Sequence, residues 1–149
     1  MKKEGLGYME NDFYTLTTYI HNKNVITYPM EDYLEMIYRL KDDAISITSL
    51  SENLNIKKSS CSKMISKLKN LKLINMVNNH IFLTEKGLKI GTYLYHRHQV
   101  LETFLKQLNK EDFKLEQVEK LEHFIDDITL KNIEKRINPS NSQSKPELK

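Results

Sequence analysis

The chain has 149 residues with three Pro and four Gly, a composition that favours one helix-rich domain or two small ones with a real hydrophobic core. No stretch approaches the roughly 18 apolar residues of a transmembrane helix, and residues 1–7 lack the apolar run of a secretory signal, so we expect a cytoplasmic protein. Cys61 is the only cysteine, which excludes an intrachain disulfide and a thiolate-cluster metal site. The ligands of any bound metal would then be oxygen and imidazole nitrogen.

Charge is segregated along the chain, although the net charge is only +3. Six lysines and no acid lie between Lys57 and Lys72, whereas eight acids and three lysines lie between Glu111 and Glu134. The first segment favours an anionic partner, and the second could hold a cation.

The first helix is expected from Met30 to about Leu40, where apolar residues recur at helical spacing after Pro29, a residue that suits a first turn. Residues 1–29 show no sustained period and are interpreted as an arm, with a short helix near residues 12–19. The Asp42-Asp43 pair is expected to close the first helix.

A second and a third helix follow closely. Thr48 is expected to cap a short helix that ends near Asn55, and a basic helix is expected over residues 59–71. The buried stripe of the basic helix consists of Cys61, Met64, Ile65, Leu68 and Leu71. The opposite face carries serines and lysines.

Two short apolar runs, residues 73–77 and 80–83, flank Asn78-Asn79, a pair that tolerates the positive φ of a tight hairpin turn. Helix, short helix, basic helix and hairpin in this order are typical of a winged helix-turn-helix. We therefore predict a mainly α protein with a winged-helix DNA-binding domain over residues 30–88.

An all-helical domain is predicted over residues 89–137. Thr84 is expected to cap a long helix that runs to about Leu108 and needs a partner helix for its apolar surface, and a further helix is expected over residues 114–133. Residues 138–149 are polar, with Pro and Ser, and are predicted to be disordered.

The basic helix suits DNA, because small hydroxyl side chains let its backbone approach a phosphate while lysines supply charge. A solvated lysine face is the alternative, and the hairpin that follows favours DNA. The candidate DNA-binding residues are Lys57, Ser59, Ser60, Lys63 and Lys67.

Candidate metal ligands recur at helical spacing in three segments. They are Asp32 and Glu35, then His98 with Glu102 one turn later, and finally Glu119, Glu122 and His123. Any one such pair is more often a solvated helix face. Together, carboxylates with a minority of imidazoles suit Mn or Fe in octahedral coordination, whereas zinc would favour thiolate or more histidine.

The chain from about residue 30 to 134 resembles the manganese transport regulators of the diphtheria toxin repressor family. The resemblance rests on residues 30–38, 59–64, 83–87, 95–98 and 118–123. It implies a two-domain, metal-dependent repressor of metal-uptake genes that binds a palindromic operator as a homodimer and lacks the SH3-like domain of the iron branch.

The same resemblance implies two Mn²⁺ ions per subunit. One ion would use Asp32, Glu119, Glu122 and His123, and the other would use Glu35 and His98 together with bridging Glu119 and Glu122. A glutamate at 119, where the iron branch typically has cysteine, indicates a manganese sensor, with Fe²⁺ as the alternative. Metal would fix the angle between the first helix and the dimerisation helices and so place two reading helices about 34 Å apart.

Two other classes of function compete with a repressor. A carboxylate-bridged dimetal enzyme would use a repeated Glu-x-x-His pattern, but Lys120 lies three residues before His123 and no second copy occurs. No nucleophile constellation is evident either, so we predict that the chain is not an enzyme. A winged-helix module that only dimerises or binds a protein would leave its acidic helix merely solvated.

Overall fold

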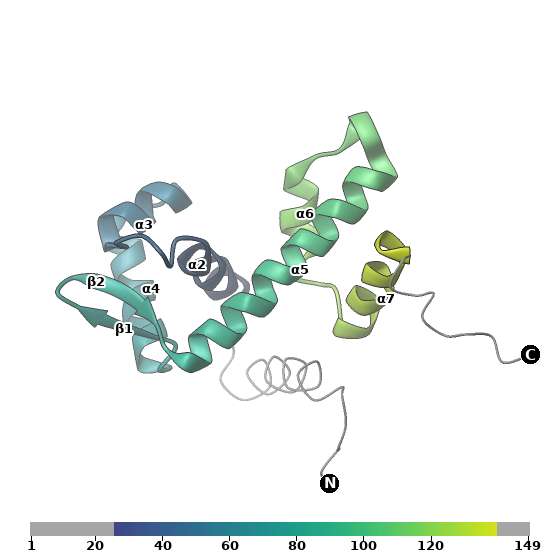
Figure 1. Ribbon diagram of the computed structural model, residues 1–149. Coiled ribbons are helices and arrows are strands. Elements are labelled where there is room, and N and C mark those ends of the chain that lie inside the picture. The colour runs from purple at the N-terminus through teal and green to yellow at the C-terminus, as the bar shows by residue number, and fades with distance from the viewer. Residues whose placement is uncertain (1–25, 140–149) are drawn as a thin grey trace, which may run out of the picture. The chain divides into compact units, whose positions relative to one another are not determined.

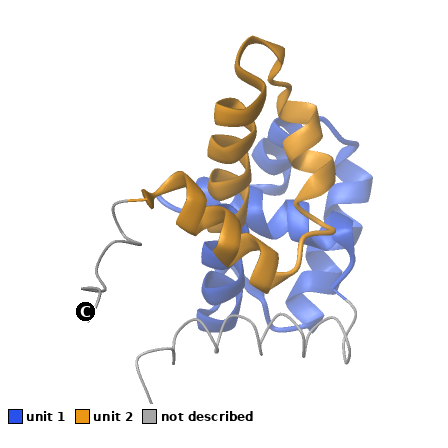
Figure 2. Cartoon of the chain, turned by 90° about the vertical axis from the view of Figure 1, so that its right-hand side faces the viewer, with its two compact units in different colours: residues 1–95 blue, residues 96–149 orange. Residues whose placement is uncertain are grey.

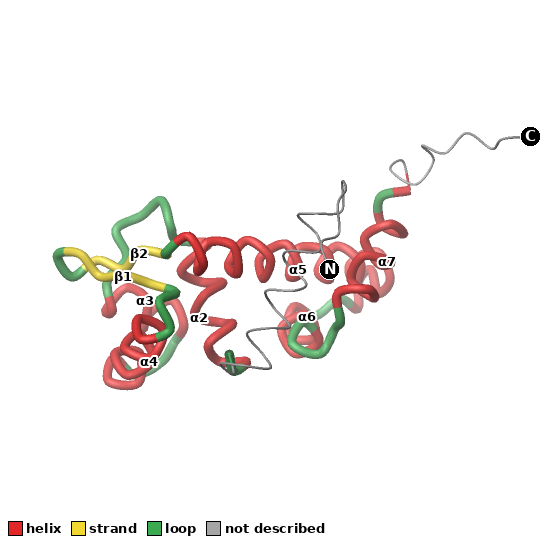
Figure 3. Tube along the Cα trace, turned by 90° about the horizontal axis from the view of Figure 1, so that it is seen from below, coloured by secondary structure: helices red, strands yellow, loops and turns green. Residues whose placement is uncertain are grey.

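The computed structural model describes residues 26–139, whose helices and strands are labelled in Figure 1. The helix predicted near residues 12–19 and the tail from residue 140 lie outside the described residues. The described part is mainly helical with one two-stranded sheet, drawn in yellow in Figure 3. None of its helices is long and apolar enough to span a membrane.

The chain divides into two compact units, residues 1–95 and 96–149, which Figure 2 colours blue and orange. Helix α5 (Glu85–Asn109) contributes its first turns to the first unit and its remaining turns to the second. The division therefore falls inside a helix. The sequence predicted a boundary between two domains at residues 88 and 89, and that boundary stays a prediction.

Helix α2 (Tyr28–Arg39) confirms the first predicted helix. The Oγ1 of Thr27 accepts a hydrogen bond from the N–H of Met30 at 3.3 Å, and Pro29 occupies the first turn, where its missing N–H costs nothing. The helix ends before Asp42-Asp43, with Leu40 as its C-cap.

Helix α3 (Ile47–Leu54) begins two residues earlier than it would with Thr48 as its N-cap, so that prediction is wrong. Ser46 is the N-cap, since its Oγ accepts from the N–H of Ser49 at 3.0 Å while the Oγ of Ser49 accepts from the N–H of Ser46 at 2.9 Å. Serine can replace glutamate in this reciprocal capping arrangement because both side chains offer an acceptor. Asn55 ends the helix with a positive φ of 54°.

Helix α4 (Lys58–Asn70) is the predicted basic helix, and Cys61, Ile65 and Leu68 are its buried residues. Strands β1 (Ile74–Val77) and β2 (His80–Leu83) pair antiparallel around Asn78 and Asn79, whose φ angles of 50° and 64° confirm the predicted hairpin turn. The N–H of Ile81 also donates to the carbonyl of Ile45 at 2.8 Å, which ties the hairpin to the segment before α3.

The core of the first unit lies between α2, α3, α4 and the hairpin. Its fully buried side chains include Leu34, Ile37, Leu50, Ile65, Leu68, Leu73, Ile74 and Ile81. Thr84 caps α5 as predicted, since its Oγ1 accepts from the N–H of Gly87 at 3.1 Å. The same hydroxyl donates to the carbonyl of Lys72 at 2.7 Å, so one side chain joins the base of the hairpin to α5.

The second unit contains the rest of α5, a 3₁₀ turn (Lys110–Asp112), α6 (Leu115–Leu121) and α7 (Asp127–Ile137). Its buried apolar residues include Leu101, Leu105, Val118 and Leu130. The single helix predicted over residues 114–133 is wrong, because Asp126 starts a new helix by accepting a hydrogen bond from the N–H of Thr129 at 2.7 Å.

Replacing Gly87 with alanine should destabilise the first unit. A Cβ at this position would lie 1.9 Å from the carbonyl oxygen of Leu73, and a backbone atom cannot step aside as a side chain can. We expect the free energy of unfolding to fall by about 1–3 kcal/mol or more, as for other overpacked sites. Urea unfolding followed by circular dichroism measures it, with exposed Leu88→Ala as the control. Equal stability of Gly87→Ala and the wild type would contradict this packing.

Candidate functional site

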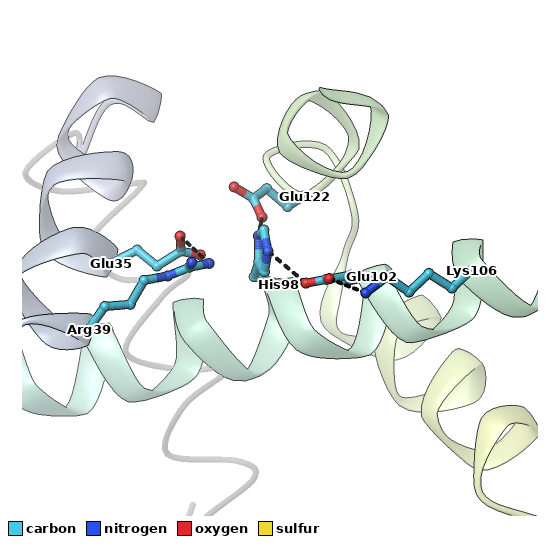
Figure 4. A network of polar contacts seen from close by, with 6 residues as sticks. All are labelled: Glu35, Arg39, His98, Glu102, Lys106 and Glu122. Carbon is cyan, nitrogen blue, oxygen red and sulfur yellow. Dashed lines mark hydrogen bonds and ion pairs between the residues drawn. The ribbon is translucent and has the colours of Figure 1, made fainter. Parts of the chain in front are cut away.

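His98 is the centre of a buried polar group in the second unit. Its Nδ1 lies 2.8 Å from Oε2 of Glu122, and its Nε2 lies 3.2 Å from Oε2 of Glu102 (Figure 4). His98 and Glu122 are 4% and 3% exposed, so the carboxylate of Glu122 has little access to water. The orientation of the imidazole is fixed because a carboxylate lies at hydrogen-bond distance from each ring nitrogen.

Glu102 joins His98 to the surface. Its Oε1 accepts a hydrogen bond from Nζ of Lys106 at 2.6 Å, one helical turn further along α5 (Figure 4). This hydrogen bond is the largest of the effects that lower the pKa of Glu102, and the charges of Lys106 and His98 add to it. Glu102 therefore stays a carboxylate and holds one side of the His98 ring.

Glu122 and His123 follow the last turn of α6. Glu122 is the C-cap of that helix, and Nε2 of half-buried His123 lies 4.0 Å from Oε1 of Glu122. Glu119 lies on α6 itself and is exposed. The structure thus brings Glu122 together with His98 and His123, while Glu119 lies on the solvent side of α6.

Asp32 and Glu35 lie in the first unit, on α2, where Asp32 is exposed and Glu35 is half-buried. Oε2 of Glu35 forms an ion pair with Nη2 of Arg39 at 3.1 Å, one turn further along the helix (Figure 4). The predicted ligands are therefore divided between the two units.

The donor atoms of the second unit fit a divalent cation. A buried carboxylate and an imidazole nitrogen already converge at hydrogen-bond distance, and a second imidazole lies beside the same carboxylate. The ligand types are oxygen and nitrogen without thiolate, a set that suits Mn²⁺ or Fe²⁺. An ion here would take the place of the hydrogen bond between His98 and Glu122.

The candidate DNA-binding side chains form one exposed surface of α4. Lys57 is its N-cap residue and makes no side-chain cap, so the leading N–H groups are not occupied by a capping side chain. All five candidate residues are exposed: Lys57, Ser59, Ser60, Lys63 and Lys67. This arrangement presents lysine charge and the positive end of a helix on the same side.

Three polar partners were not found from the sequence. Arg39 and Lys106 each lie four residues after a candidate ligand, a spacing that could have revealed them. His96 pairs through Nε2 with a carboxylate oxygen of Glu134 on α7 at 3.2 Å. No spacing rule connects residues so far apart along the chain.

Both halves of the chain match known domains. Residues 26–79 match the iron-dependent repressor N-terminal DNA-binding domain, and residues 84–145 match the iron-dependent repressor metal-binding and dimerisation domain. The chain therefore belongs to the iron-dependent repressor family. The fold and the family are those of DNA-binding regulators and not of enzymes.

Several solved structures are similar. The manganese regulator SloR is 30% identical with a TM-score of 0.64, and the match covers 72% of this chain and 53% of SloR. A manganese-dependent transcriptional repressor in complex with manganese is 27% identical with a TM-score of 0.64, covering 72% of this chain and 52% of that chain. ScaR with bound Zn²⁺ is 26% identical with a TM-score of 0.63, covering 72% and 53%. The chain spans about half the length of these relatives.

Removing the cap at Asp126 should weaken the turn that carries Glu122 and His123. Hydrogen bonds from Thr129, first from its side chain and then from its backbone, hold the pKa of Asp126 below its ordinary value of 3.8. A lowered pKa means that the ionised cap stabilises the fold above that value and that this contribution is lost as the pH falls through the lowered pKa. Asp126→Ala should therefore lower the Tm at pH 7, and the difference should shrink below about pH 3.8.

Thermal melts of Asp126→Ala between pH 2 and pH 7 measure this dependence. Asp126→Asn is the control, because asparagine keeps an acceptor for the N–H of Thr129 but cannot ionise within this range. An Asp126→Ala melting difference that is equally large at both ends of the range would contradict the role of the charge.

Proposed function

We propose that the chain is a manganese-responsive transcriptional repressor that acts in the cytoplasm as a homodimer on a palindromic operator. The observation that carries this proposal is the buried pair of His98 and Glu122, inside the half of the chain that matches a metal-binding domain. Oxygen and nitrogen donors without thiolate favour Mn²⁺ and Fe²⁺ over a structural zinc site.

The proposed ligands are divided between two ions per subunit. Asp32, Glu119, Glu122 and His123 would hold one, and Glu35 and His98 would hold the other with Glu119 and Glu122 as bridges. A bound divalent ion would neutralise carboxylates that otherwise repel one another. Ligands from α2 and from the second unit would then tie the DNA-binding unit to the rest of the chain, which makes the geometry of α4 depend on metal.

Manganese is favoured over iron by the names of the relatives. SloR is described as a manganese regulator, and a second relative as a manganese-dependent repressor. ScaR with Zn²⁺ shows that a relative also accepts zinc. Fe²⁺ is the alternative activator here, because the same donor types suit it and because the matching family is that of iron-dependent repressors.

Dimerisation is supported by apolar surface on the second unit. Leu108, Leu115, Phe124 and Ile128 are exposed, with Phe124 at 73% and Ile128 at 65%. Large exposed apolar side chains grouped on one small unit are typical of a protein interface. A second copy of the chain fits this surface, since the matching domain is described as a dimerisation domain.

The first experiment compares the metals that restore DNA binding. Fluorescence anisotropy of a labelled palindrome, selected from random DNA by the protein with Mn²⁺, should show binding with Mn²⁺, weaker binding with Zn²⁺ and none with chelator. Glu122→Gln should lose the manganese dependence while keeping its fold, because glutamine keeps the shape but not the charge of the buried ligand. The expected loss of metal coupling is about 1–3 kcal/mol.

Glu116→Gln is the matched control, since Glu116 is an exposed acid of α6 that pairs with Lys120 at 2.9 Å and is not a proposed ligand. Manganese-dependent binding retained by Glu122→Gln would refute the proposed site. Tight binding that ignores chelator in the wild type would leave a DNA-binding dimer without metal control, and strong activation by Fe²⁺ alone would favour the iron alternative.

The reading surface has its own test. Lys63→Ala should weaken operator binding and should reduce the slope of log K against log salt by about one unit, because one phosphate contact releases about one counterion. Lys89→Ala on α5 is the control, as Lys89 is an exposed lysine outside α4. An unchanged salt slope for Lys63→Ala would exclude Lys63 from the phosphate contacts.

A further inference from the structure

Arg39 holds a proposed metal ligand of α2. Its Nη2 lies 3.1 Å from Oε2 of Glu35, and the side chains of Arg39 and Glu35 are 34% and 14% exposed. The side chain of Glu35 is thus mostly shielded from water while it forms an ion pair with the guanidinium of Arg39. A half-buried pair is screened less than an ordinary surface pair.

A second contact fixes the same guanidinium. The Cζ of Arg39 lies 5.2 Å from the ring centroid of Tyr95, and the Tyr95 ring lies 5.4 Å from that of Tyr38, with a tilt of 42°. Gly91 packs closely against Tyr38, since a Cβ added to Gly91 would lie 2.9 Å from the Cβ of Tyr38. All of these residues belong to the first unit, where the tyrosines support the arginine in place.

We propose that Arg39 is an internal competitor for the metal, a residue that occupies Glu35 in the metal-free chain and so sets the metal concentration needed for binding. The inference rests on the proposed function, because it requires Glu35 to be a ligand. It assigns to Arg39 a role in the threshold of the response and not in coordination.

The sign of the effect follows from charge. A metal that binds Glu35 either displaces the guanidinium or binds next to it, and in both cases the fixed positive charge opposes a divalent cation. Arginine stays protonated at any working pH, so its own charge is constant.

The test is manganese binding by the full chain in the absence of DNA. The electron paramagnetic resonance signal of free Mn²⁺ falls as the ion binds, and this gives the affinity directly. Arg39→Gln should bind Mn²⁺ about two- to fivefold more tightly than the wild type at low salt, a change of the size that one partly exposed ion pair supplies. Arg39→Lys keeps the charge but not the planar guanidinium over Tyr95, so its Mn²⁺ affinity should lie closer to that of the wild type than that of Arg39→Gln does.

Lys131→Gln is the matched control. Lys131 forms an i,i+4 pair with Asp127 at 3.0 Å, and Asp127 is not a proposed ligand. This variant loses the same charge and should leave manganese affinity unchanged. Thermal melts should show that each variant is folded.

A double variant separates the two proposals. In a Glu35→Gln background, Arg39→Gln should have no further effect, because the competed ligand is gone. If Glu35→Gln weakens manganese binding but Arg39→Gln does not strengthen it, the competitor role is refuted and the metal site stands. If Glu35→Gln leaves manganese affinity unchanged, or the wild type binds no manganese, the proposed ligand set fails and this inference fails with it.

Discussion

The carboxylate of Glu122 is the most demanding group in the second unit, because a buried negative charge is stable only when a cation or several donors face it. His98 provides that partner at 2.8 Å, and Glu102 holds the other ring nitrogen at 3.2 Å. Glu102 is itself paired with Lys106 at 2.6 Å, so the acid that remains without a lysine or arginine in this group is Glu122. A divalent ion can bind a carboxylate and an imidazole at the same time, which makes this pair a suitable start for a metal site.

The buried side of α6 gives Glu122 its position. Val118 is fully buried, and Glu122 follows it by four residues with its N–H still donating to the Val118 carbonyl at 3.0 Å. Residues four apart on a helix share a face, so Glu122 lies on the same buried side as Val118. Glu119 lies one residue after Val118 and is exposed, and the helix ends with Glu122 as its C-cap before the cap at Asp126 starts α7.

Much of the first unit was predictable from periodicity. The stripe of α4 and the hairpin around Asn78 were found because burial repeats with a fixed period and because only a few residues tolerate positive φ. The start of α3 was misplaced, since Ser46 and Thr48 are both good caps and the choice depends on which one Ser49 can reach. The break before α7 was missed because the apolar residues on its two sides happen to keep one helical phase.

The candidate site was predictable in residue type but not in pairing. Spacing along a helix identified His98, Glu122 and His123, whereas Lys106 and Arg39 were overlooked because long side chains choose their partners through rotamers that the sequence does not specify. The partner of Glu122 is 24 residues away along the chain, a separation at which only the packed structure defines contacts.

Lysine and arginine side chains of the chain itself already pair with two acids of the candidate ligand segments. Glu35 with Arg39 and Glu102 with Lys106 are i,i+4 pairs in different units, and each neutralises an acid of a candidate ligand cluster. Because these pairs already satisfy the carboxylates, a bound ion adds less to the stability of either unit than it would to a site of unpaired acids. A metal that binds Glu35 would have to compete with Arg39, so this pair lowers the net free energy of metal binding. Only that net free energy could favour one geometry of the DNA-binding unit over another.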